Sequence, residues 1–433
     1  MGEVFYSSKL SRNVILMIYP AVFLVQAAKM FGLQINTFLH VPLLLLVVYL
    51  GFQKIGWLKK NGSGKDISLF VAYLAYVFAS VIMSGINGLP LDVYTSSFTT
   101  YIFPMFFFLW GADTRDTSDN FSKVLFFSML AAVSVGLYLH ITTPSFYTSY
   151  MYEVKQAGYM ASQYVTEATI MESKRFSGIF ESSYTISYLG MCAMLIGLSW
   201  ILTHRTKYNN VVLLAAVTIF IVSLFLCLQR IAIAMTVVFL LLFLIWGNKS
   251  GVKSLRYYGL GLFALIMVIP VITISLSERS EQLYMLLSAR FETMDFNEAM
   301  AGRTNQYAQV DFVSADKIFG NGIGSASTFA IDNYNVQGVT DGEYVKQIME
   351  LGYVGLGILL ILVLKSVLKV RGYFRYFSME ICIVFYYLVA GIGHNSLTTY
   401  FTVYAFWFFL GRLNNSAYIK RIKLLKNNTY VKS

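Results

Sequence analysis

The strongest constraint on the fold is a series of apolar segments that are each long enough to cross a lipid bilayer. A bilayer accepts roughly 20 apolar residues per crossing helix, and lipid favours helices because the backbone must form its hydrogen bonds internally. Hydrophobic residues make up 57% of the 433-residue chain and charged residues 13%, which is more apolar surface than a soluble domain can bury. We therefore predict an all-α integral membrane protein with about twelve transmembrane helices. They cover residues 13–33, 37–57, 67–86, 94–112, 121–142, 183–203, 210–228, 231–247, 256–276, 343–364, 376–393 and 396–412.

The distribution of lysine and arginine predicts the orientation. The N-terminus, the turns after every second predicted span and the C-terminal tail hold 23 of the 33 basic residues. Since basic loops stay in the cytoplasm, both termini are predicted to be cytoplasmic. The net charge of +11 is then explained by topology and by contact with anionic lipid, and it does not indicate nucleic-acid binding. Residues 1–433 are predicted to form a single polytopic membrane domain.

Two long polar loops, residues 143–182 and 277–342, interrupt the apolar segments and lie on the predicted outer side. Both contain arginines, which suggests an anionic substrate at the outer surface. No spacing of ligand residues indicates a metal site, and Cys192, Cys227 and Cys382 lie inside apolar segments, where a cysteine behaves as a small apolar side chain. The sequence therefore predicts neither a metal nor another cofactor.

Three arginines stand out as candidate substrate-binding residues. Arg175 precedes the sixth predicted span, Arg230 lies in a very short turn between two spans, and Arg303 lies in the second long loop. A guanidinium group binds phosphate bidentately and stays charged at any relevant pH, so converging arginines suit a diphosphate. The alternative is that Arg230 extends to the membrane interface and that the other two pair with loop carboxylates.

Two carboxylates lie where the second loop re-enters the membrane. Asp341 and Glu343 stand just before or at the start of the tenth predicted span. A carboxylate in this position can orient or deprotonate an acceptor hydroxyl. Asp341 could instead be a helix N-cap, and one residue could serve both purposes.

Taken together, these motifs resemble the O-antigen polymerase and ligase families of bacterial surface-polysaccharide assembly. The resemblance covers most of the chain in architecture, whereas its motifs lie mainly between residues 175 and 355. They are an Arg-x-x-Gly-x-Phe-like segment at 175–180, an arginine opening a span at 229–230, Gly-Arg at 302–303, alternate glycines at 318–324, an acidic segment at 341–345 and Glu-x-Gly-x-x-Gly at 350–355. The ligases have histidine where this chain has Asp341, which favours the polymerases.

The resemblance implies a polysaccharide polymerase, a membrane-embedded glycosyltransferase of O-antigen (lipopolysaccharide) or capsule synthesis. Donor and acceptor would be polyprenyl-diphosphate-linked oligosaccharides, such as undecaprenyl diphosphate derivatives, at the outer face of the bacterial cytoplasmic membrane. Arg175, Arg230 and Arg303 would bind the departing diphosphate, and Asp341 or Glu343 would act on the acceptor hydroxyl. We expect inversion at the anomeric carbon, independence from metals, and a chain-length regulator and a flippase as partners.

Two alternatives stay open. A lipid-linked oligosaccharide flippase would also be a multi-span protein, but no inverted repeat is visible. The predicted spans also hold few ionisable residues at the membrane midplane, where transport coupling sites tend to lie. An O-antigen ligase would share the fold and differ mainly at Asp341.

Overall fold

The structure is a computed structural model, and every regular element that it describes is a helix. No strand occurs among the described residues. The structure describes residues 2–31, 40–60, 64–142, 144–147, 150, 176–180, 182–203, 208–227, 229–248, 310–327, 342–399 and 401–430.

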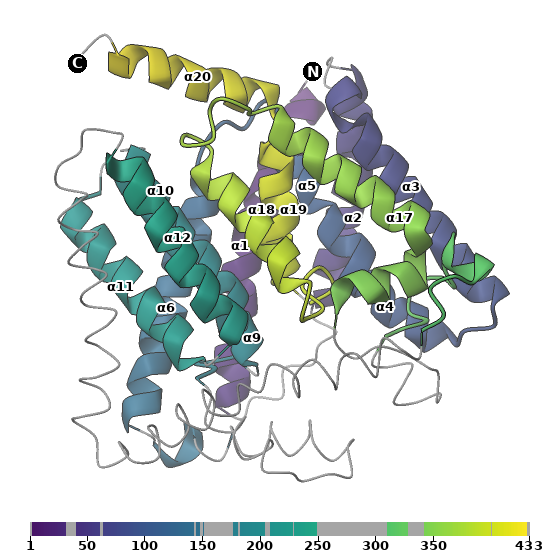
Figure 1. The fold of residues 1–433 in the computed structure, drawn as a ribbon, viewed down its shortest axis with the longest axis horizontal. Helices are drawn as coiled ribbons and strands as arrows, with labels where there is room; N and C mark the ends of the chain where they lie inside the picture. Colours follow the sequence, from purple (N-terminus) through teal and green to yellow (C-terminus); the bar gives the residue numbers. More distant parts are fainter. Residues whose placement is uncertain are drawn as a thin grey trace. The chain divides into compact units, whose positions relative to one another are not determined.

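The described helices fall into three groups along the chain (Figure 1). Those before the first long loop are α1 (Gly2–Met30), α2 (His40–Lys60), α3 (Gly64–Ile86), α4 (Leu91–Met105), α5 (Phe107–Gly111) and α6 (Asn120–Thr142). The next group comprises α9 (Ser183–Thr185), the π-helical turn η2 (Ile186–Gly190), α10 (Met191–Thr203), α11 (Asn210–Leu226) and α12 (Arg230–Asn248). The last group comprises the short 3-10 turn η3 (Ala315–Lys317), α17 (Glu343–Leu368), α18 (Ser378–Ala390), α19 (Val403–Arg412) and α20 (Ser416–Tyr430).

Helices occupy each predicted span that falls on described residues, whereas the span predicted at 256–276 lies outside them. Two details of the prediction are wrong. The segment 94–112 is divided at Phe106, two residues after Pro104, because proline lacks the amide donor that a continuous helix needs. The last segment begins late, at Val403. Its preceding residues form turns in which side chains bond to the backbone, as Ser396 Oγ does to the Tyr387 carbonyl at 2.7 Å.

Five of the described helices are long and apolar enough to cross a membrane. They cover Arg12–Met30, Ile67–Ile86, Asn120–Thr142, Ser183–Thr203 and Glu343–Leu368. Further apolar helices, such as α11 and α18, are shorter. These lengths and compositions fit a helical membrane protein, and the total of twelve spans stays a prediction.

The chain folds as two compact units. Unit 1 contains Met1–Val25, Gln34–Leu125 and Asp311–Ser433, and unit 2 contains Gln26–Leu33 and Phe126–Val310.

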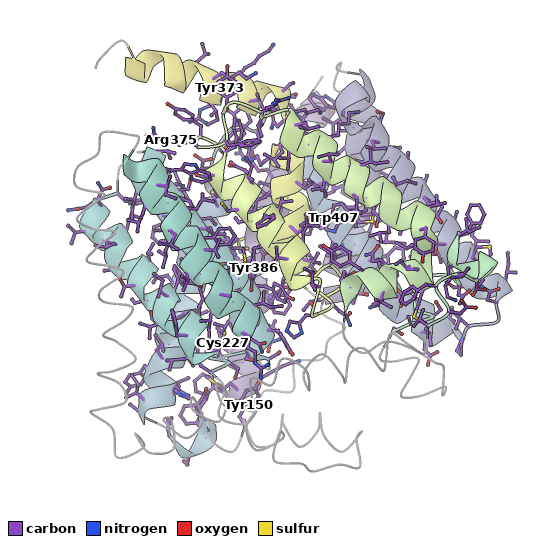
Figure 2. All side chains as sticks on the ribbon, in the orientation of Figure 1. Tyr150, Cys227, Tyr373, Arg375, Tyr386 and Trp407 are labelled. Carbon is purple, nitrogen blue, oxygen red and sulfur yellow. The ribbon has the colours of Figure 1, made fainter. Side chains whose placement is uncertain are left out.

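The core of unit 1 is built largely from stacked aromatic rings. Phe70 stacks on Phe108 with ring centroids 4.1 Å apart, and Phe107 stacks on Tyr404 at 4.4 Å. Trp407 of α19, labelled in Figure 2, contacts the ring of Phe70 at a centroid distance of 6.1 Å. Such contacts add to the energy of apolar burial and fix α3, α5 and α19 against one another.

The core of unit 2 is α10, whose residues from Met191 to Leu202 are all buried. It packs against α11 and α12. Trp200 and Phe220 both contact the ring of Phe126, at centroid distances of 5.1 and 5.4 Å. A helix that is apolar on every side can be surrounded by other helices in this way, and α10 therefore forms the interior of unit 2.

Candidate functional site

The candidate site residues are divided between described and undescribed parts of the chain. Arg175, Arg303 and Asp341 lie outside the described residues. Glu343 is the first residue of α17 in unit 1, and Arg230 is the first residue of α12 in unit 2. Each is therefore considered within its own unit.

Glu343 is fully buried, with 0% of its surface exposed, and protein donors hold both of its carboxylate oxygens. Gln347 Nε2 donates to Oε1 at 2.8 Å. The Leu397 amide and the Thr398 hydroxyl donate to Oε2 at 3.0 and 3.2 Å. A buried carboxylate is stable only with such partners. Glu343 therefore anchors the start of α17 to the turn before α19.

Glu343 belongs to a set of charged and polar residues on one face of α17. Lys346, Gln347 and Glu350 follow it at intervals of three, four and seven residues, which share one side of a helix. All four side chains are buried. We call Glu343, Lys346, Gln347 and Glu350 the carboxylate cluster.

Lys346 lies between the two carboxyl groups along α17, and its contacts within the described ranges do not include a direct ion pair with either. Its Nζ donates to Thr398 Oγ1 at 3.1 Å, and this hydroxyl in turn bonds to Glu343. Its ammonium also lies 5.5 Å from the ring centroid of Tyr101, whose hydroxyl donates to Glu350. One buried lysine thus lies near two buried carboxyl groups. Sequence reasoning overlooked Lys346, although the spacing of charged residues in an apolar helix was visible.

Glu350 connects α17 to the segment with alternate glycines. The Ala326 amide donates to Glu350 Oε1 at 3.2 Å, and the Tyr101 hydroxyl of α4 donates to Oε2. The Glu350 backbone carbonyl accepts from the Gly322 amide at 3.0 Å and from the Ser80 hydroxyl of α3 at 3.2 Å. This one residue therefore joins α3, α4, α17 and the end of the second predicted loop.

The backbone of this junction requires two glycines. Gly352 has φ +70° and ψ 178°, which kinks α17, and Gly320 has φ +77°. A Cβ on Gly320 would lie 2.5 Å from the Glu350 carbonyl oxygen, and one on Gly352 would overlap the Ile318 carbonyl. Both the left-handed backbone and the close approach exclude larger residues. The alternate glycines at 318–324 and the Glu-x-Gly-x-x-Gly motif at 350–355 thus contact each other through Gly320 and Gly352.

In unit 2, the segment that follows Arg175 lies against the end of α11. The Phe176 amide donates to the Leu226 carbonyl at 3.0 Å, and the Tyr147 hydroxyl donates to the Gly178 carbonyl at 3.1 Å. Phe176 and Gly178 are buried. The chain beside Arg175 and the chain four residues before Arg230 are therefore joined by a backbone hydrogen bond.

Arg230 has unused hydrogen-bonding capacity. It begins α12, and its half-buried side chain has a buried Nε that has no hydrogen-bond partner among the described residues. The neighbouring Gln229 is held by a bond from its Nε2 to Ser183 Oγ at 3.1 Å. A helix N-terminus and a guanidinium group both favour an anion. The arrangement can bind a phosphate oxygen.

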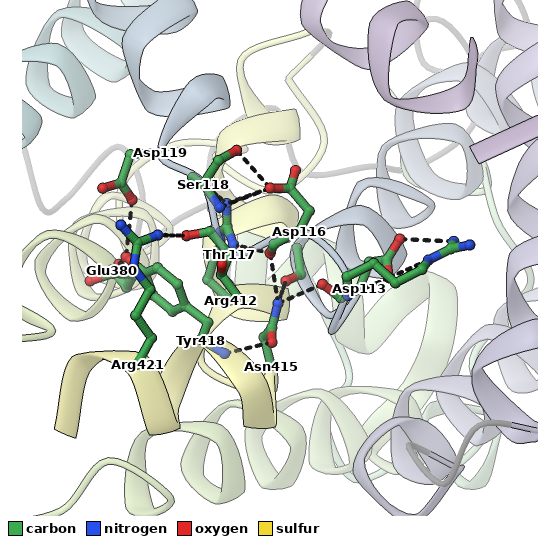
Figure 3. A network of polar contacts seen from close by, with 12 residues as sticks. Asp113, Asp116, Thr117, Ser118, Asp119, Glu380, Arg412, Asn415, Tyr418 and Arg421 are labelled. Carbon is green, nitrogen blue, oxygen red and sulfur yellow. Dashed lines mark hydrogen bonds and ion pairs between the residues drawn. The ribbon is translucent and has the colours of Figure 1, made fainter. Parts of the chain in front are cut away.

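A second buried polar network in unit 1 joins residues 113–119, the start of α18 and the chain from Arg412 into α20 (Figure 3). Arg412 is 2% exposed, and its guanidinium donates to the Asp116 carbonyl at 2.6 Å and to the Ser118 carbonyl. Asn415 donates to the Asp113 carbonyl at 2.7 Å. Glu380 of α18 accepts from the Tyr418 hydroxyl at 2.7 Å. We call these residues and their neighbours Lys54, Arg115, Asp119 and Arg421 the Arg412 network.

Asp113 is the centre of charge pairing in the Arg412 network. Its carboxylate pairs with Lys54 at 2.8 Å and with Arg115 at 3.1 Å. Burial alone raises the pKa of Asp113, but the two cations outweigh it and bring the pKa below its ordinary value. Asp113 is therefore an ionised structural group.

Within the described ranges, no three His, Cys, Asp or Glu side chains are grouped so that they could hold a metal ion. Metal independence stays a prediction.

No protein-family model matches this chain, and neither does any curated protein sequence.

Proposed function

We propose that this chain is a membrane glycosyltransferase that polymerises lipid-linked glycan repeat units at the outer face of the bacterial cytoplasmic membrane. The proposal keeps about twelve spans and cytoplasmic termini. The substrates would be two polyprenyl-diphosphate-linked oligosaccharides of O-antigen or capsule synthesis. A chain-length regulator and a flippase would be its protein partners.

The observation that carries the proposal is the environment of Arg230. Its Nε is buried and unpaired among the described residues, at the start of a helix. The same unit joins the chain on the C-terminal side of Arg175 to Leu226, close to Arg230 in sequence. Two predicted diphosphate ligands therefore belong to neighbouring segments. Preorganised positive charge is commonly the largest contribution to catalysis when a leaving group becomes negative.

In the proposed reaction, an acceptor hydroxyl oxygen forms a bond to the anomeric carbon of the donor. The bond from that carbon to the diphosphate oxygen breaks with inversion, and the diphosphate leaves with the bonding electron pair. Arg175, Arg230 and Arg303 would stabilise its charge. The proton of the hydroxyl would go to a carboxylate.

Of the two candidate carboxylates, we assign the proton to Asp341. Glu343 is fully buried, and donors from Gln347, Leu397 and Thr398 already hold its oxygens. Its role would be to hold the start of α17, two residues after Asp341, in a fixed position.

A flippase is the second candidate, and the carboxylate cluster favours it. The start of α17 carries Glu343, Lys346 and Glu350 within its first eight residues, and all three are buried. Buried ionisable residues in membrane helices commonly mark transport pathways. The ligase alternative has no such observation in its favour.

One assay distinguishes these functions. Purified protein in liposomes would receive polyprenyl-diphosphate oligosaccharide together with EDTA, and products would be read as a glycan ladder. We expect a ladder from the unaltered protein, none from Arg230→Gln, and a weaker one from Arg230→Lys, which keeps charge but loses the bidentate fork. Arg371→Gln, at an exposed position after α17, is the matched control and should leave the ladder intact.

Movement of substrate between leaflets without a ladder would support the flippase and contradict the polymerase. A ladder unaffected by Arg230→Gln would contradict the role of Arg230 in diphosphate binding, on which the proposal depends.

A further inference from the structure

The Glu350 carboxyl group is neither the proton acceptor nor a diphosphate ligand in the reaction proposed above. It is 0% exposed, and its two oxygens accept from two different elements, the Ala326 amide and the Tyr101 hydroxyl of α4. A buried polar group is stable when it has hydrogen-bond partners of this kind. The segment 318–326 is therefore held by a buried carboxyl group as well as by its backbone.

The same segment is fixed to α3 and α17 by several other bonds. Asn87 Nδ2 donates to the Asn321 carbonyl at 2.8 Å, and the Ser84 hydroxyl donates to the Ile323 carbonyl at 2.8 Å. The Asn321 amide donates to the Met349 carbonyl at 2.8 Å, beside Glu350. Each of these bonds uses a main-chain group of the segment, so they set its path without depending on its side chains.

The two parts that Glu350 joins have a particular place in the sequence. The segment begins fifteen residues after Arg303, and Glu350 lies nine residues after Asp341. Glu350 lies in the first eight residues of α17, so it fastens the segment to the end of the helix that Asp341 precedes.

We propose that Glu350 is a positioning residue, whose carboxyl group fastens the segment 318–326 to α17 and thereby holds the start of α17, next to the proposed proton acceptor in sequence, in the position that the reaction needs. This proposal rests on the function proposed above. Misplacement of reacting groups by about 1 Å can reduce turnover by about 100-fold. Loss of the fastening should therefore lower kcat much more than it raises KM.

The first test measures the fastening without using activity. Ser325 is 7% exposed and has nearly the shape of cysteine, and the natural cysteines Cys192, Cys227 and Cys382 are buried. In a Ser325→Cys protein, maleimide labelling should be slow. Adding Glu350→Ala should speed it about tenfold or more, because the buried Ala326 amide and Tyr101 hydroxyl would lose their shared acceptor. Glu380→Ala, which removes another fully buried carboxylate of unit 1, is the matched control and should not speed labelling.

The second test restores the fastening by another route. Asn87→Cys with Asn321→Cys would place a disulfide where the Asn87 side chain is already hydrogen-bonded to the Asn321 carbonyl. In Glu350→Ala, this disulfide should restore the glycan ladder, and reduction should abolish it again in the same sample. Failure of the disulfide to form would contradict the docked segment and overturn the proposal.

The outcomes separate this proposal from the proposed function. Faster labelling in Glu350→Ala, with no ladder from the unaltered protein, would retain the fastening and refute the polymerase. A ladder from the unaltered protein, with labelling and kcat unchanged in Glu350→Ala, would refute the fastening. If Glu350→Ala does not insert, Tyr101→Phe removes one of its donors and should speed labelling by a smaller factor, and unchanged labelling would overturn the proposal.

Discussion

The carboxylate cluster and the Arg412 network lie near opposite ends of α18, and both bury ionisable side chains. They differ in balance. The described part of the Arg412 network has four cationic side chains (Lys54, Arg115, Arg412 and Arg421) and four anionic ones (Asp113, Asp116, Asp119 and Glu380). The carboxylate cluster has one cation, Lys346, for two anions, Glu343 and Glu350.

The difference indicates which end is specialised for function. The carbonyls at helix ends and in turns need hydrogen-bond donors, and paired charged side chains can supply these donors without leaving a net buried charge. An unmatched buried charge costs free energy, and proteins retain such costs mainly at functional sites. The Arg412 network is therefore interpreted as structural, and the carboxylate cluster as part of a working site.

The largest effect should come from removing the single cation of the carboxylate cluster. Lys346→Met would leave two buried carboxylates without a cation and should destabilise the protein by about 3–5 kcal/mol. The measurements are the yield of inserted protein and its thermal unfolding in detergent. Lys365→Met, at an exposed position on the same helix, should have little effect. Adding Glu343→Gln to Lys346→Met should recover part of the loss, and no recovery would contradict the charge argument.

A smaller effect on stability, with no effect on catalysis, is expected in the Arg412 network. Arg412→Met removes charge-assisted bonds to the Asp116 and Ser118 carbonyls and should cost about 3 kcal/mol. Thermal unfolding measures the loss, and the glycan ladder is compared at equal amounts of folded protein. If correctly folded Arg412→Met produced no ladder, this would contradict the interpretation of the Arg412 network as structural and of the carboxylate cluster as functional.

Disturbing the kink at Gly352 should reduce activity more than it reduces stability. Gly352→Ala forces a left-handed backbone on alanine and should cost about 1–3 kcal/mol. We expect normal insertion with a much weaker ladder, because the segment 318–326 can no longer dock. Gly357→Ala is the matched control, since a Cβ there meets nothing within 4 Å and alanine favours a helix. Equal activity of the two variants would contradict the proposed contact.

The smallest effect is the acid dependence of the Arg412 network. Because the pKa of Asp113 is lowered in the folded protein, its ionised form contributes stability above about pH 4, the ordinary value for an aspartate. That contribution is lost as the pH falls through the lowered pKa of the folded state. Thermal unfolding between pH 6 and pH 3, chosen to bracket that ordinary value, should show an acid loss that is shallower in Asp113→Asn. An equal acid loss in both proteins would exclude Asp113 as its source.

The helices themselves were predictable because apolar length is a local property of the sequence. Residues 343–364 were assigned to a span and form most of α17. The kink inside α17 was not predicted, since Gly352 in an apolar run looks like any helical glycine until Gly320 is placed against it.

The candidate site was predictable only in part. Glu343 and Arg230 were singled out by position, whereas Lys346 and Tyr101 matter through partners that are distant in sequence, as the bond from Tyr101 to Glu350 illustrates. Tertiary contacts of this kind leave no local pattern. The predictions for Arg175, Arg303 and Asp341 concern residues outside the described ranges and stay predictions.

The contact between Gly320 and Gly352 has a consequence for evolution. At each glycine, the backbone of the other segment occupies the space where a side chain would lie, so neither position can be substituted independently of the other. A substitution at one position should become tolerable only in a lineage where the loop has already moved away from α17. Among homologues, the two positions should therefore change together, and a family that lost both glycines should also have lost the buried acid at position 350.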